Sequence, residues 1–228
     1  MERSFSEFVK AEVPDGSVLI SVGLPGSWKS PVTEEIAKGK GFQILRSDII
    51  RLEVLKGLDV FDHQVASSPE NRAKVYEEMF RQAAEALKTS AKGLILDATF
   101  FTQDLRSRAA ELAQRAKRTL VIAECVCTEE KSIERILKRT KDHYESNALT
   151  REAYLNNKAL FEPVNIRSLK KRFKAVPMRA RCEKAWGKFP TCRRAWGSYS
   201  SASKPTSFRS DSRRSNRADA SASRFCSV

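Results

Sequence analysis

The sequence predicts an α/β fold of three layers, in which helices cover both faces of a parallel β-sheet. Short apolar runs alternate along the chain with longer segments of helical periodicity, an order typical of parallel strands joined by crossover helices. The first apolar run leads through a glycine-containing loop into a helical segment, and a later run ends directly at an aspartate. A chain of 228 residues can hold one such domain with an appendage.

The strands are expected at short runs dominated by aliphatic residues. In chain order these are Val18–Val22, residues 42–45, residues 94–97 and residues 120–126. Such runs, bounded by turn residues, favour buried strands. After Val164 only residues 173–176 suggest a further strand, so we expect the last strand of the sheet to be either this weak run or absent.

Helices are expected between the strands, over residues 33–38, 70–89, 103–117 and 129–139. The longest of them spaces Val75, Met79 and Ala83 four residues apart, which places the three side chains on one apolar stripe. An amphipathic helix of this kind buries its stripe against a sheet, in agreement with the layered fold.

Composition divides the chain into a domain over residues 1–164 and a tail over residues 165–228. The tail holds 17 Lys and Arg against three Asp and Glu, whereas the first 164 residues hold 25 of each kind. The formal net charge of +14 therefore lies entirely in the tail. Because the tail is rich in Arg, Lys and Ser and ends in some 30 residues with few aliphatic side chains, we expect it to be largely disordered. Its composition departs from that of the domain so sharply that a shifted reading frame is one hypothesis for it.

No membrane or secretory feature is expected. No apolar run approaches the roughly 20 residues that span a bilayer, and the first residues lack the form of a secretion signal. Five cysteines without a C-x-x-C pair give no disulfide framework, and Cys125 and Cys127 are expected on one core-facing side of a strand. We therefore expect a cytoplasmic protein.

The loop after the first strand has the pattern of a phosphate-binding loop. Residues 23–30 read GLPGSWKS and fit G-x-x-x-x-G-K-[ST] at seven of eight positions. In this pattern backbone N–H groups surround the phosphates of a nucleotide, the lysine reaches the β and γ oxygens, and the hydroxyl binds Mg²⁺. The residues expected to hold the nucleotide are Gly23, Pro25, Gly26, Ser27, Trp28, Lys29 and Ser30.

Two residues depart from this pattern. Trp28 stands where the second glycine is expected, and an indole adds bulk and loses the easy access of glycine to positive φ. Pro31 lacks an N–H group and biases Ser30 away from the helical conformation. The sequence therefore leaves open whether the loop still binds ATP.

Acidic and basic residues at the ends of later strands complete a candidate site. Asp48 follows the second strand, and in a parallel sheet it shares the carboxyl edge with Lys29. There Asp48 can accept a proton from an attacking hydroxyl, or simply cap the following helix. Arg51, one turn later, can hold a phosphate of the substrate. Asp97 either binds a metal-coordinated water, orients the substrate or only ends its strand.

In these motifs and their order, residues 15–164 resemble the P-loop kinases related to phage polynucleotide kinase, zeta toxins and chloramphenicol phosphotransferase. The matching segments are residues 23–30, SDIIR at 47–51, LILDAT at 94–99, residues 134–139 and LFEPV at 160–164. The resemblance implies transfer of the γ-phosphoryl group of ATP to a hydroxyl with Mg²⁺. It implies phosphate and metal roles for Lys29 and Ser30, the general base at Asp48, the substrate contact at Arg51, and a lid that carries Arg135 and Arg139.

Three functions stay open at this stage. The first is an ATP-dependent phosphotransferase whose acceptor is a nucleic-acid end or a nucleotide-like molecule, as Arg51 suggests. The second is a nucleotide-binding protein without turnover. The third is a nucleic-acid-binding module that uses the basic tail. For Arg135 and Arg139 the alternative is a solvated basic helix face, because Lys131, Lys138 and Lys141 lie nearby. Arg106 and Arg108 are expected at the surface.

Overall fold

The computed structural model describes residues 4–140, 146–181 and 192–193, all of which lie in one compact unit. Its strands are β1 (Val18–Val22), β2 (Gln43–Arg46), β3 (Leu94–Asp97), β4 (Leu120–Val126), β5 (Ala175–Arg181) and β6 (Cys192–Arg193). Its helices are α1 (Phe5–Glu12), α2 (Lys29–Lys40), α3 (Ser47–Val54), α4 (His63–Ser67), α5 (Pro69–Thr89), α6 (Gln103–Arg115), α7 (Glu129–Leu137), α8 (Arg151–Leu160) and α9 (Ile166–Arg172).

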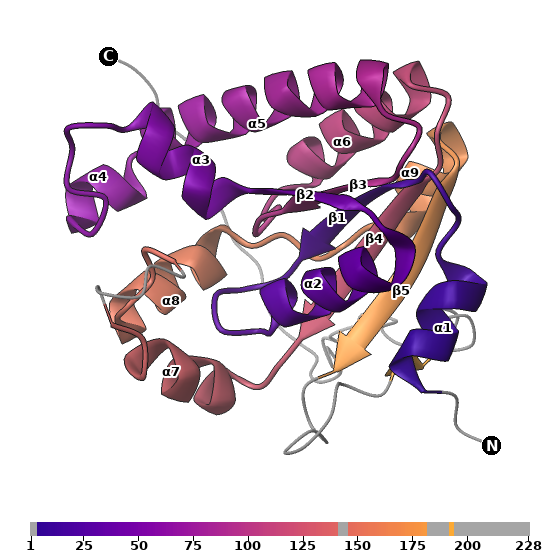
Figure 1. Cartoon of the computed structure of the whole chain (residues 1–228). Helices are drawn as coiled ribbons and strands as arrows, with labels where there is room; N and C mark the ends of the chain where they lie inside the picture. Colours follow the sequence, from indigo (N-terminus) through magenta and orange to yellow (C-terminus); the bar gives the residue numbers. More distant parts are fainter. Residues whose placement is uncertain (1–3, 141–145, 182–191, 194–228) are drawn as a thin grey trace, which may run out of the picture. The chain divides into compact units, whose positions relative to one another are not determined.

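The strands form one sheet in the order β2-β3-β1-β4-β5-β6. The first five pair in parallel, and β6 runs antiparallel to β5. The carboxyl ends of β1, β2 and β3 therefore lie at the same edge, where the loop at 23–28, α3 and the residues after Asp97 begin. Strand β1 sits between β3 and β4, so the loop that follows it lies near the centre of that edge (Figure 1).

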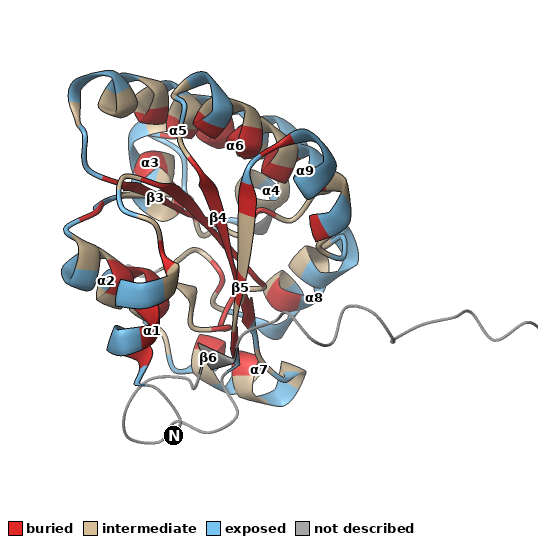
Figure 2. Ribbon diagram, turned by 90° about the vertical axis from the view of Figure 1, so that its right-hand side faces the viewer, coloured by how far each residue is buried: buried red, intermediate tan, exposed pale blue. Residues whose placement is uncertain are grey.

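Helices cover both faces of the sheet, and alternate residues of each strand enter one of two cores (Figures 1 and 2). Val18 and Ile20 of β1 pack with α5, α6 and α9, whereas Leu19 packs with α1 and α2. All five residues of β1 are buried, as expected for a strand with a core on each side. The predicted three-layer α/β/α fold with a parallel sheet is confirmed.

Local sequence signals explain where the helices begin and end. Ser68, Thr102, Thr128 and Thr150 each accept a hydrogen bond from a backbone N–H in the first turn of the following helix. Helix α5 also begins with a proline, whose missing N–H costs nothing at that position. Helix α2 ends at Lys40, and the following Gly41 takes the left-handed conformation.

The last parallel strand of the sheet, β5, differs from the expectation. It is present, but it spans Ala175–Arg181 instead of 173–176, and it pairs with the whole of β4. The strand is hard to predict from the sequence because it contains Pro177 and two arginines. Pairing with β4 stabilises it despite these residues. Residues 166–172 and 175–181 of the predicted tail are thus helix and strand. The rest of that tail lies outside the described residues, except for β6.

Two smaller expectations are settled by burial and by helix composition. Cys125 is buried, whereas Cys127 is only partly buried, so the core position holds for Cys125 alone. Within the described ranges, no helix combines the length and the apolar character that crossing a bilayer requires.

Candidate functional site

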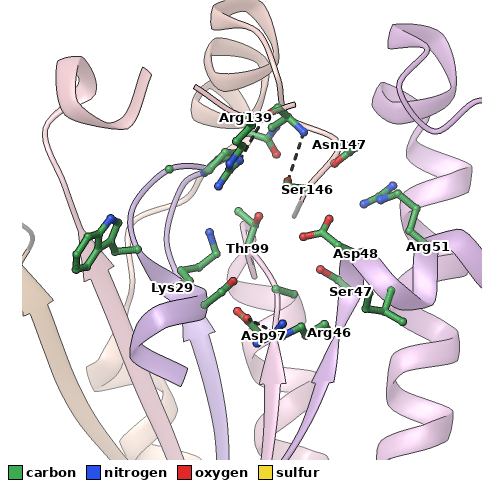
Figure 3. A pocket seen from close by; sticks show the side chains of 18 of the residues that line it. Lys29, Arg46, Ser47, Asp48, Arg51, Asp97, Thr99, Arg139, Ser146 and Asn147 are labelled. Atoms are coloured by element: carbon green, nitrogen blue, oxygen red, sulfur yellow. Dashed lines mark hydrogen bonds and ion pairs between the residues drawn. The ribbon is translucent and has the colours of Figure 1, made fainter. Parts of the chain in front are cut away.

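A cavity of about 730 Å³ opens at the carboxyl edge of the sheet. Its walls come from the loop after β1, the start of α3, the first half of α5, the end of β3, the end of α7 and residues 146–148. In Figure 3, Lys29 and Asp48 approach the same space from opposite sides, with Thr99 between them in this view, Asp97 below and Arg139 above. The structure therefore brings Lys29 and Asp48 together, as the spacing of the motifs predicts.

The glycines of the loop are required by close contacts with the backbone. A Cβ atom on Gly23 would lie 2.4 Å from the carbonyl oxygen of Cys125, and one on Gly26 would lie 2.4 Å from that of Ser132. Gly26 also has φ 76°, which L side chains rarely adopt. These glycines let the loop pack against the end of β4 and against α7.

Trp28 adopts the left-handed backbone conformation that is usual for the glycine expected at this position of the loop. Its φ is 71° and its ψ is 28°, in the left-handed region, directly before the first residue of α2. The expectation that tryptophan would lose access to positive φ is therefore wrong: the loop keeps its path at a conformational cost of about 1–2 kcal/mol. The guanidinium carbon of Arg135 lies 4.8 Å from the centre of the indole ring, within the range of a cation–π contact.

The expectation for Ser30 is also wrong. Helix α2 begins at Lys29 and includes both Ser30 and Pro31, so the proline does not keep Ser30 out of the helical conformation. Pro31 occupies the first turn, where N–H groups have no partner within the helix, so it breaks no internal hydrogen bond. It still removes one of the N–H groups that the start of α2 offers to an anion.

Lys29 projects from the first turn of α2 into the cavity. Its Nζ donates to the carbonyl oxygen of Leu24 at 2.9 Å, within the same loop. Burial lowers the pKa of Lys29, while the negative charges of Asp97 and, more weakly, Asp48 act in the opposite sense. A phosphate in the cavity would offer this ammonium group a charged partner in place of a neutral carbonyl.

Asp97 is almost completely buried at the end of β3 and is held by the two neighbouring elements. One carboxylate oxygen accepts from the hydroxyl of Ser21 at 2.7 Å and the other from that of Thr33 at 3.2 Å. The Nε of Arg46 lies 4.0 Å from the same carboxylate. Thr33 and Ser21 were missed by the sequence analysis, and the only signal for them was a polar residue on an otherwise apolar face.

Asp48 lies in the first turn of α3, with its carboxylate in the cavity (Figure 3). Burial raises the pKa of Asp48, and the positive charge of Arg51 acts against this shift. A carboxyl group with a raised pKa is a stronger base than an exposed one when it is ionised. Asp48 does not cap α3 with its side chain, because Arg46 is the residue before the helix and no side-chain cap is present there.

Arg51, one turn after Asp48, lines the same cavity. Its Nε and Nη1 are buried and have no hydrogen-bond partner. An arginine that points into a cavity with unpaired donors is suited to a bound anion, which can accept two parallel bonds from the guanidinium group. The residue that the sequence analysis expected to contact the substrate therefore lies at the cavity, as that role requires.

Arg135 and Arg139 both line the cavity, but they do not share a helix face. Helix α7 ends at Leu137, so Arg139 lies beyond it, contrary to the expected helix over 129–139. Arg135 donates to the carbonyl oxygen of Gly26 at 3.0 Å, which joins α7 to the loop. Arg139 donates to the carbonyl oxygen of Ala148 at 3.2 Å, and it projects over the cavity in Figure 3.

Arg106 contradicts its expected position at the surface, because it is completely buried. Its guanidinium group donates to four backbone carbonyl oxygens, those of residues 100, 101, 162 and 163, and lies 5.1 Å from the ring centre of Phe161. It thereby fastens the LFEPV segment to the loop after β3. No local pattern predicts this, because the carbonyl groups come from two segments about 60 residues apart.

Comparison with known proteins agrees with this geometry. A family model described as an AAA domain, AAA_33, matches residues 18–164. A protein from Chloroflexus aurantiacus j-10-fl that is assigned as a kinase is 19% identical, with a TM-score of 0.54 over 72% of this chain and 87% of that one. A gluconokinase from Sinorhizobium meliloti 1021 is 16% identical, with a TM-score of 0.47 over 72% of this chain and 82% of that one.

The APS kinase CysC of Mycobacterium tuberculosis, solved with AMPPNP and APS, is 17% identical, with a TM-score of 0.47 over 75% of this chain and 91% of that one. No curated protein matches the sequence. The family model covers well over half of the chain, including the loop at 23–30, Asp48 and Asp97. The chain therefore belongs to the AAA domain family AAA_33 and has the fold of a P-loop kinase.

Proposed function

We propose that the protein is an ATP-dependent phosphotransferase that moves the γ-phosphoryl group of ATP to a hydroxyl group. The observation that carries the proposal is that Lys29, at the start of α2, and Asp48, at the start of α3, share one cavity that Asp97 also lines. This arrangement supplies a cation for the phosphates on one side and a carboxylate for the attacking hydroxyl on the other.

Each residue has a distinct part in the proposed reaction. The loop at 23–30 holds the phosphates through its backbone N–H groups, and Lys29 contacts the β and γ oxygens. Asp48 takes the proton of the acceptor hydroxyl as its oxygen forms the new P–O bond, the bond between the γ phosphorus and the bridging oxygen breaks, and ADP leaves. Arg135 and Arg139 neutralise charge that develops on the transferred group.

The residues around the loop also fit Mg²⁺. This ion binds proteins through one or two oxygen ligands and takes others from phosphates and water. The hydroxyl of Ser30 lines the cavity in the first turn of α2, and the buried carboxylate of Asp97 lies beside that turn through Thr33. When bound, the ion would neutralise charge on the β and γ phosphates.

ATP-induced stabilisation tests the nucleotide part of the proposal. Addition of ATP and Mg²⁺ should raise the melting temperature of the full chain, and Lys29→Ala should remove the rise. Lys38→Ala, at an exposed position of the same helix, is the matched control and should keep it. An equal rise in the Lys29→Ala variant would show that ATP binds elsewhere.

The catalytic part is tested by transfer of label from γ-³²P ATP to a panel of hydroxyl acceptors that includes oligonucleotide 5′ ends and nucleotides. Removing the base should lower the rate of transfer by about 100-fold or more. If Asp48→Ala leaves transfer unchanged, the assignment of the base fails.

Binding of ATP without turnover is the second candidate, and the loop supports it. Trp28 holds a left-handed conformation, and Pro31 lacks an N–H group that could contact phosphate. A protein that shows the ATP-induced rise in melting temperature but transfers phosphate to no acceptor, and to water no faster than the Asp48→Ala variant, would fit this candidate.

Nucleic-acid binding by the basic tail concerns residues that lie mostly outside the described part. A chain ending at Val164 that keeps the affinity for nucleic acid and its salt dependence would exclude this function.

A further inference from the structure

Two arginines form one wall of the cavity, on the side away from the phosphate-binding loop. Arg51 comes from α3 and Arg72 from the first turns of α5. The aromatic side chains of Tyr76 and Phe101 complete this wall. Arg72 was not selected by the sequence analysis, and it has no part in the roles assigned above.

The donors of this pair are largely unused. Arg51 has two buried nitrogens without a partner. Arg72 donates its Nε to the carbonyl oxygen of Ala66 at 3.3 Å and lies 5.8 Å from the ring centre of Phe101. Among the described residues, no carboxylate lies within 4 Å of either guanidinium group. Neither cation of the wall therefore has an ion-pair partner within that distance in the described part of the chain, and the carboxylate that acts on Arg51 through its charge is Asp48, in the same cavity.

The two charges are close enough to affect each other. Burial lowers the pKa of Arg72, and the next cause is the positive charge of Arg51. Burial also raises the pKa of the Tyr76 hydroxyl, which accepts from the N–H of Phe100 at 2.9 Å and is held in place by that bond. Keeping two like charges together in a partly buried wall costs free energy, which a bound anion would recover.

We propose that Arg51 and Arg72 together form an acceptor subsite for a phosphomonoester dianion whose carbon skeleton packs against Phe101. The inference rests on the proposed function, and it names the acceptor class: a molecule that carries a terminal phosphate in addition to the hydroxyl that reacts. Two guanidinium groups match the three terminal oxygens and two charges of a monoester better than the two free oxygens and single charge of a diester. A neutral acceptor would leave both cations unpaired.

Titration calorimetry on the full chain separates this subsite from the loop. The protein carries Lys29→Ala to weaken phosphate binding at the loop, and the probes are inorganic phosphate, phenyl phosphate and diethyl phosphate. Phenyl phosphate should bind more tightly than inorganic phosphate because its ring can pack on Phe101, and diethyl phosphate should bind at least about tenfold more weakly than phenyl phosphate.

Substitutions on α5 and α3 identify the binding residues. Adding Arg72→Gln or Arg51→Gln should weaken phenyl phosphate binding by at least about tenfold. Arg81→Gln is the matched control, because Arg81 lies on the same helix, is exposed and pairs with Glu78. Arg72→Lys keeps the charge but loses the two parallel N–H donors of the guanidinium group, so it should retain part of the affinity for phenyl phosphate. It replaces Arg72→Gln if that variant does not fold.

Three results would overturn the inference: no binding of phenyl phosphate, an equal affinity of the Arg72 and Arg81 variants, or diethyl phosphate binding as tightly as phenyl phosphate. The proposed function can fail separately. If ATP and Mg²⁺ do not stabilise the protein with Lys29 intact, while phenyl phosphate binding still depends on Arg51 and Arg72, the kinase proposal is wrong and the anion subsite stands.

Discussion

Replacing Trp28 with glycine is the sharpest test of the loop. The left-handed backbone at this residue costs tryptophan about 1–2 kcal/mol, which glycine would recover. Two effects of the substitution destabilise the folded state. The cation–π contact with Arg135, worth about 0.5–1 kcal/mol, is lost. Glycine also gives the unfolded chain more backbone entropy, which lowers the free energy of unfolding by about 0.5–1 kcal/mol. These contributions nearly cancel. The melting temperature without ligand should therefore change by no more than about 4 °C.

Binding of ATP should respond much more strongly. Glycine at position 28 removes the indole from a loop that must approach the phosphates, and we expect at least a tenfold gain in affinity. With the same excess of ATP and Mg²⁺, a tenfold gain adds about 1.4 kcal/mol of stability. For a chain of this size the additional rise in melting temperature is about 3–6 °C.

Scanning fluorimetry of matched variants gives the answer. Trp28→Phe keeps an aromatic ring and the left-handed strain, so its ATP-induced rise should equal that of the natural protein. Trp28→Gly combined with Pro31→Thr restores an N–H group as well and should give the largest rise. If Trp28→Gly shows the same ATP-induced rise as the natural protein, the steric argument about the indole is refuted.

Three further predictions concern stability. Because burial raises the pKa of Asp48, ionisation of this carboxyl group costs the folded state free energy. Asp48→Asn should therefore raise the melting temperature at pH 7, and the gain should disappear as the pH falls below the ordinary pKa of 3.8, where the carboxyl is protonated in both states. Arg106→Met should lower the free energy of unfolding in urea by at least about 3 kcal/mol, because it removes a buried side chain that donates to four carbonyl groups, whereas Arg108→Met at a partly exposed ion pair should cost about 1 kcal/mol or less. Thr33→Val should cost about 1–2 kcal/mol by removing the hydroxyl that lies 3.2 Å from the Asp97 carboxylate and 2.9 Å from the carbonyl oxygen of Ser30, and a change below about 0.3 kcal/mol would show that these contacts are unimportant.

The order of elements and the meeting of Lys29 with Asp48 could be predicted from the sequence because both follow from topology. Apolar runs identify the strands, and parallel pairing places every carboxyl end at one edge. No detailed side-chain geometry is needed for that inference. The same reasoning placed Asp97 at the edge, although it did not find Thr33 or Ser21, whose hydroxyl groups acquire their partner only when three segments come together.

The residues that sequence reasoning misplaced depend on contacts distant in the chain. Strand β5 contains Pro177 and two arginines, and it exists because β4 pairs with it along its whole length. Arg106 looks like a surface residue until two segments supply its carbonyl partners. Trp28 was not expected to adopt positive φ, yet the packing of the loop against α7 holds it in that conformation. In each case tertiary contacts outweigh a local preference.

The charge of the cavity points to a polyanion independently of the state of the loop. Seven basic side chains line it against three acidic ones. Lys29, Arg72 and Arg135 donate to neutral carbonyl oxygens, and two buried nitrogens of Arg51 have no partner among the described residues. A carbonyl satisfies a donor without cancelling its charge, so each of these cations gains Coulombic energy when an anion replaces the carbonyl. The cations lie on both sides of Asp48, which is the distribution that two phosphorylated molecules, one for each wall, would require.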